Sequence, residues 1–135
     1  FSTIAINAVK ELSTDGISAF SFIKNIENAY KAADVIISRA GAIAISELCV
    51  IGKPVILIPS PNVAENHQFK NAQSLVNKNA ALLVKDSQAN DKLVLKVISL
   101  KNDSQLMKEL SVNIKTMEAK EASSIIASHA MSLIK

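Results

Sequence analysis

The turn at residues 38–42 combines small side chains with a single arginine, Arg39. A strand is predicted to end at Ser38 and a helix to begin near Gly41. Small residues let a ligand or another backbone come close, and the first N–H groups of a helix, at the positive end of its dipole, favour a phosphate. We therefore interpret this turn as a candidate phosphate site. The alternative is that Gly41 and Ala42 only permit tight packing between helix and sheet.

Glu47 follows this turn by about one and a half helical turns. Its carboxylate has two acceptor oxygens, and a ribose has two neighbouring hydroxyl donors, so the two groups match in geometry. Glu47 is a candidate ribose ligand at the edge of the same crevice, or else a solvated helix residue. The common nucleotide fingerprints, G-x-G-x-x-G and the P-loop lysine motif, are absent from the sequence.

A second polar stretch, residues 60–71, follows the next predicted strand and opens a predicted helix. His67, Gln68 and Asn71 have a spacing that lets them face one crevice. An amide both donates and accepts hydrogen bonds, so it recognises sugar hydroxyls well. The alternative is a helix that simply begins with polar residues. As a general base, His67 has no carboxylate or nucleophile that spacing alone places beside it.

Short apolar runs alternate with helical periods along the chain, a pattern that is typical of parallel βαβ units. Solid apolar strands indicate burial on both faces. We predict an α/β Rossmann-like parallel sheet with helices on both faces, built from βα units over 1–88 and followed by C-terminal helices over 89–135. The predicted strands are 17–20, 34–38, 54–58 and 80–84. The predicted helices are 1–12, 25–33, 42–51, 65–77, 90–100, 104–115 and 119–134.

The composition excludes several classes of protein. The chain has 135 residues, of which 49% are hydrophobic and 20% charged, as expected for one globular domain or part of one. No apolar run approaches the about 20 residues of a membrane span, and no signal peptide is visible. The one cysteine, Cys49, excludes an internal disulfide and a cysteine-based metal site, and we expect no metal and no cofactor.

The charge pattern argues against a nucleic-acid partner. The net charge is +3, but the lysines are spread along the chain and Arg39 is the only arginine. There is no basic stripe, aromatic platform or recognised nucleic-acid motif. A solvated lysine surface explains the excess of positive charge.

In order and spacing, the motifs of the chain resemble the C-terminal domain of the MurG family, the N-acetylglucosaminyltransferases of peptidoglycan synthesis. The resemblance covers about residues 17–135 and is densest over 20–72. It implies a GT-B glycosyltransferase with two Rossmann-like domains, of which this chain is an incomplete C-terminal, UDP-sugar-binding one. The matching stretches are 32–42, Ser46-Glu47-Leu48, Gly52-Lys53-Pro54, Pro59, His67-Gln68 and Asn71-Ala72.

The resemblance also implies a role for each candidate residue. Phe22 and Ile23 would border the uracil, and the helix start at 41–43 would lie beside the diphosphate and ribose. Glu47 would hold the ribose hydroxyls. Arg39 would either contact the ligand or lock its turn. The proposed donor-binding set is Phe22, Ile23, Gly41, Ala42, Ile43, Glu47, His67, Gln68 and Asn71, in which His67 and Gln68 meet the sugar hydroxyls with support from Asn71.

The partners and location follow from the same resemblance. The donor would be UDP-N-acetylglucosamine, and the acceptor a lipid-linked muramoyl-pentapeptide bound by an N-terminal domain missing here. That domain would hold the catalytic base and the membrane contact, so the 135 residues alone are expected to be inactive. The whole enzyme would be cytoplasmic and peripheral on the inner membrane. Two alternatives are a UDP-sugar 2-epimerase-like enzyme of the same architecture and a non-catalytic α/β interaction module.

Overall fold

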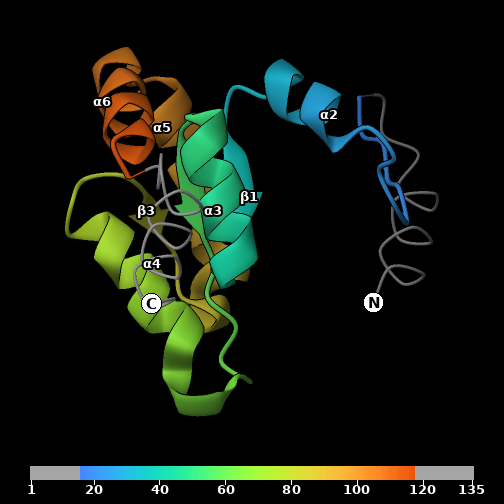
Figure 1. Ribbon diagram of the computed structural model, residues 1–135. Helices are drawn as coiled ribbons and strands as arrows, with labels where there is room; N and C mark the ends of the chain where they lie inside the picture. The colour runs from blue at the N-terminus through green and yellow to red at the C-terminus, as the bar shows by residue number, and fades with distance from the viewer. Residues whose placement is uncertain (1–15, 118–135) are drawn as a thin grey trace, which may run out of the picture. The chain divides into compact units, whose positions relative to one another are not determined.

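Three parallel strands form the sheet of the protein, in a computed structural model that describes residues 16–117 (Figure 1). They are β1 (Ile36–Ser38), β2 (Val55–Leu57) and β3 (Leu82–Leu83), in the order β1-β2-β3. Ile36 pairs with Val55, and Ile56 pairs with Leu82, both in parallel register. The strands predicted at 34–38, 54–58 and 80–84 are thus confirmed, with shorter ends.

The chain divides into two compact units, Phe1–Ala32 and Ala33–Lys135, which we describe separately. In the first unit, α2 (Ile26–Ala32) confirms the helix predicted at 25–33. The strand predicted at 17–20 is wrong: the described strands pair only with one another, and a segment without a ladder partner forms no strand. The helices predicted at 1–12 and 119–134 lie outside the described residues.

In the second unit, helices connect and follow the strands. α3 (Ala42–Ile51) joins β1 to β2, and α4 (His67–Val76) joins β2 to β3. α5 (Ala89–Lys101) and α6 (Ser104–Lys115) follow β3. All four were predicted, and the bounds of α3 and α6 agree with the prediction residue for residue.

The two faces of the sheet pack against different helices. β2 is buried, and its side chains alternate between the faces. Side chains of β2 and of the segment that follows it share a core with α5 and α6 on one face, while Figure 1 shows α3 in front of the sheet and α5 behind it. The predicted helices on both faces are therefore confirmed. The buried core cluster on the α5 side is Ile56, Ile58, Val84, Leu100 and Leu110.

The end of α3 and the start of α4, the two helices that connect the strands, explain where the turns lie. Gly52 ends α3 in the left-handed conformation, at φ 67°, and donates its N–H to the Leu48 carbonyl, as expected for a glycine after a helix. α4 begins differently from the prediction, because a short 3-10 helix (Ala64–Asn66) precedes it. In that segment Glu65 and Asn66 adopt positive φ values of 50° and 58°.

Candidate functional site

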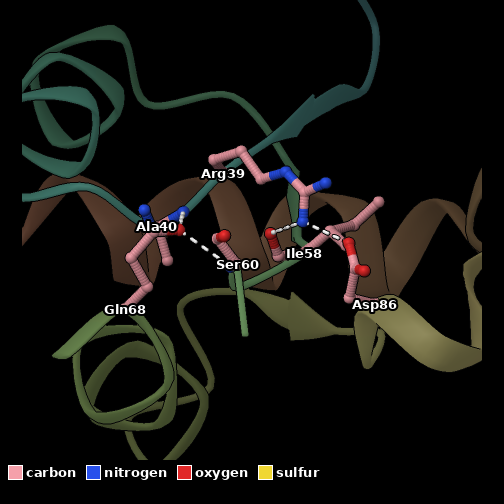
Figure 2. A network of polar contacts seen from close by, with 6 residues as sticks. All are labelled: Arg39, Ala40, Ile58, Ser60, Gln68 and Asp86. Atoms are coloured by element: carbon pink, nitrogen blue, oxygen red, sulfur yellow. Dashed lines mark hydrogen bonds and ion pairs between the residues drawn. The ribbon is translucent and has the colours of Figure 1, made fainter. Parts of the chain in front are cut away.

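The candidate site lies at the carboxyl edge of the sheet, where three strand-to-helix turns meet. The strands are parallel, so the turns after β1, β2 and β3 all lie at the same edge. In open α/β sheets this edge is where ligands bind. Figure 2 shows the polar contacts that connect the three turns.

The N-terminus of α3 opens onto this edge without a side-chain cap. Gly41 is the N-cap residue, with φ −69° and ψ 149°, and as a glycine it has no side chain that could cap the helix. The N–H groups of the first helical turn have no partner within the helix, which is the basis of anion binding at such ends. Ala42 is exposed, and the Ile43 side chain is 79% exposed.

The surroundings of Gly41 are inconsistent with a packing role. A Cβ atom added there would meet nothing within 4 Å among the described residues, and its φ is one that any residue adopts. Neither tight packing nor backbone conformation therefore requires glycine at this position. The open space leaves room for a ligand to come close, and the ligand contact itself stays a prediction.

Gln68 connects two turns through one oxygen atom. Its Oε1 accepts from the backbone N–H of Ser60 at 2.9 Å and from that of Ala40 at 3.3 Å. Asn71 contacts the same turn, because its Nδ2 donates to the Ala40 carbonyl at 3.2 Å. The structure therefore brings the two predicted polar stretches together.

Arg39 ties the end of β1 to the other two turns. Its Nη1 donates to the Ile58 carbonyl at 3.2 Å and also forms an ion pair with Asp86, which follows β3 (Figure 2). Of the two predicted roles for Arg39, these contacts support the one that locks the turn. Sequence reasoning missed Asp86, because nothing in its local sequence marks it as a partner 47 residues from Arg39.

His67 has a carboxylate partner that spacing did not predict. Its Nε2 lies 3.4 Å from Oε2 of Glu65, and both side chains are exposed. The positive φ of Glu65 and of Asn66 shapes the backbone between the two side chains. Sequence spacing alone did not place this carboxylate beside His67.

Glu47 lies farther along α3, four residues after Ile43, so the two side chains share one side of the helix. Both are exposed. Phe22 and Ile23 belong to the first unit, where their side chains are 79% and 41% exposed. The ligand contacts expected of these residues remain predictions.

A cavity of about 420 Å³ opens beside the connected turns. Residues of the β3 turn, for which no role was predicted, line one part of it. Among the described residues, no group of three His, Cys, Asp or Glu side chains could hold a metal ion. Within the same part of the chain, no helix is long and apolar enough to span a membrane. The cavity is lined by Pro59, Ser60, Pro61, Asn66, Phe69, Lys85, Asp86 and Ser87.

Comparison with known proteins gives a consistent result. Residues 3–126 match the family described as the glycosyltransferase family 28 C-terminal domain. A Bacteroides thetaiotaomicron protein named UDP-N-acetylglucosamine–N-acetylmuramyl-(pentapeptide) pyrophosphoryl-undecaprenol N-acetylglucosamine transferase is 47% identical over 131 residues, 97% of this chain and 35% of its own length. A Phocaeicola vulgatus protein of the same name is 52% identical over 106 residues, 78% of this chain and 28% of its own length.

The solved structures include a similar fold. The crystal structure of Acinetobacter baumannii MurG superposes with a TM-score of 0.81 and 25% sequence identity. The match covers 94% of this chain and 38% of that one. The chain thus spans about a third of the length of the relatives that it matches.

Proposed function

The chain belongs to the C-terminal domain of glycosyltransferase family 28, and from this we propose that it is the donor-binding part of an N-acetylglucosaminyltransferase. The donor is UDP-N-acetylglucosamine, and the acceptor is a lipid-linked muramoyl-pentapeptide, as in the names of its relatives. The reaction inverts the anomeric centre of the transferred sugar and contributes to peptidoglycan synthesis.

The observation that carries this proposal is the uncapped N-terminus of α3 with open space at Gly41. Transfer of the sugar leaves negative charge on the departing UDP. Fixed N–H groups and a helix dipole stabilise such charge without reorganisation during the reaction. Among the described residues, the Cβ position of Gly41 is unobstructed, so the diphosphate can reach these N–H groups.

The remaining donor contacts are assigned to the residues for which the sequence predicts them. Glu47 holds the ribose hydroxyls from the exposed side of α3 that it shares with Ile43. Phe22 and Ile23 border the uracil. His67 and Gln68 meet the sugar hydroxyls with support from Asn71, and Gln68 does so through Nε2, because its oxygen already binds two backbone N–H groups.

Acceptor binding and the catalytic base belong to the N-terminal domain of the full-length enzyme, since this chain spans only about a third of the length of its relatives. The same domain makes the membrane contact, on the cytoplasmic face of the inner membrane. This chain contributes donor binding and stabilisation of the leaving group. It needs no cofactor for either task.

A transfer assay with the full-length enzyme tests the proposal. Incubation with UDP-N-acetylglucosamine and the lipid-linked acceptor is expected to release UDP and to yield a disaccharide-pyrophosphate lipid. Omission of the acceptor should abolish UDP release. Formation of a 2-epimer without acceptor would instead identify an epimerase, and failure to bind UDP at all would contradict both enzyme assignments.

A further inference from the structure

We propose that Gln68 and Asn71 are positioning residues that hold the Ala40 peptide and thereby orient the N-terminus of α3 toward the donor diphosphate. The inference rests on the proposed function, since the diphosphate is the group that the oriented N–H groups would bind. The hydrogen bonds that carry it are independent of any ligand.

Both backbone polar groups of Ala40, its N–H and its carbonyl, are hydrogen-bonded by side chains of α4. It is 0% exposed, and it lies directly before Gly41, the N-cap residue of α3. Its N–H donates to Gln68 at 3.3 Å, and its carbonyl accepts from Asn71 at 3.2 Å. The two side chains are three residues apart on α4 and so lie on one side of that helix. The position of the peptide before α3 is therefore set by α4.

The oxygen of Gln68 also holds the neighbouring turn. It accepts from Ser60, which follows β2, at 2.9 Å. A carbonyl oxygen has two acceptor sites, and both are used here by backbone donors. Loss of this oxygen leaves two part-buried N–H groups without a protein acceptor, which costs more than an ordinary hydrogen bond contributes.

The two amides have opposite polarity in these contacts. Two N–H donors face Gln68, so the atom that meets them must be its oxygen. A carbonyl faces Asn71, so the atom that meets it must be its NH₂ group. A carboxylate can therefore replace the amide at residue 68 but not at residue 71, where it would place oxygen against oxygen.

This asymmetry defines a matched pair of variants, Gln68→Glu and Asn71→Asp, in the full-length enzyme. Each adds one negative charge to the same contact network and changes no volume. We expect Gln68→Glu to bind UDP roughly ten-fold more tightly than Asn71→Asp, which corresponds to about one hydrogen bond. Uridine, which lacks phosphate, should bind equally to both variants. If a substitution only disturbed the fold, the affinities for uridine and for UDP would both fall.

Hydrogen–deuterium exchange of the Ala40 amide gives a readout without ligand. Exchange is expected to remain slow in Gln68→Glu and to become faster in Gln68→Met, which lacks the acceptor. Equal UDP affinities for Gln68→Glu and Asn71→Asp would overturn the positioning role. Equal exchange rates of the Ala40 amide in Gln68→Glu and Gln68→Met would overturn it as well. If the unmodified enzyme binds no UDP, the proposed function fails, and with it the orienting role. The exchange rates then still show whether the oxygen of residue 68 holds Ala40.

Discussion

Gly41 is a glycine that neither the backbone nor the described packing around it requires. Its φ of −69° suits any residue, and a Cβ atom would meet no described atom within 4 Å. A requirement for glycine here must therefore come from outside these contacts, and the donor diphosphate is the proposed cause.

The Gly41→Val variant is accordingly expected to fold while losing donor affinity. The added side chain occupies the space that the diphosphate needs, so UDP affinity should fall at least about ten-fold, whereas the free energy of unfolding should fall by no more than about 1 kcal/mol, the usual range of an N-cap change. Calorimetry with UDP and chemical denaturation measure the two quantities. Undiminished UDP binding would show that the helix start does not meet the donor.

Glu47 is expected to account for recognition of the ribose. Charge-assisted hydrogen bonds contribute about 1.5–3 kcal/mol each, so Glu47→Ala should lower UDP affinity by roughly ten- to hundred-fold. The control is 2′-deoxy-UDP, which already lacks one hydroxyl. The variant should lose less affinity for this ligand than for UDP. The same loss for both ligands would place Glu47 away from the ribose.

At the level of single residues, the sequence predicted that the 38–42 and 60–71 stretches meet, but not which hydrogen bonds join them. The convergence of the Ser38–Ala42 and 60–71 stretches follows from parallel strands, a property visible in the apolar runs. The partner of Arg39, Asp86, and the Glu65 carboxylate beside His67 depend on long-range placement and on a positive φ at a non-glycine residue. Local pattern does not contain either kind of information.

At the level of elements, Arg39 joins the ends of three consecutive βα units. It leaves the end of β1, donates to the Ile58 carbonyl after β2 and pairs with Asp86 after β3. The two contacts are expected to contribute differently to the stability of the domain. The ion pair is between side chains that are 56% and 38% exposed, whereas the bond to Ile58 is part-buried. Solvent therefore screens the ion pair with Asp86 more than it weakens the hydrogen bond to the Ile58 carbonyl.

Arg39→Ala should therefore destabilise the domain more than Asp86→Asn does. We expect a loss of about 1–2 kcal/mol for Arg39→Ala, which removes both contacts, and of less than about 1 kcal/mol for Asp86→Asn, which removes only the ion pair. Urea unfolding of both variants measures the difference. Equal losses would mean that the bond to Ile58 contributes nothing to stability.

The helix and strand predictions were correct where the sequence pattern that marks the element is local. The start and end of α3 were predicted correctly, since Gly41 and Gly52 mark its ends. The segment 17–20 has the composition of a strand, but strand formation also needs a partner, and the described strands pair only among themselves. The start of α4 was misplaced because Glu65 and Asn66 adopt a conformation that favours neither helix nor strand.

At the scale of the whole molecule, the chain corresponds to about a third of its relatives. Its carboxyl edge provides the uncapped α3 terminus and the connected turns, a surface suited to hold a donor. Transfer of the sugar also needs a second substrate and a group that removes the proton from the attacking hydroxyl. The proposal assigns both to the N-terminal domain, so donor binding and transfer are separable.

The 135 residues by themselves are therefore expected to transfer no N-acetylglucosamine, while the full-length enzyme is active in the same assay with UDP-N-acetylglucosamine and the lipid-linked acceptor. Radiolabelled donor measures the product, and addition of the N-terminal domain as a separate chain serves as the complementation control. Any transfer by the 135 residues alone would contradict the division of labour. It would then direct attention to His67, whose Nε2 lies 3.4 Å from the Glu65 carboxylate, as the base within this chain.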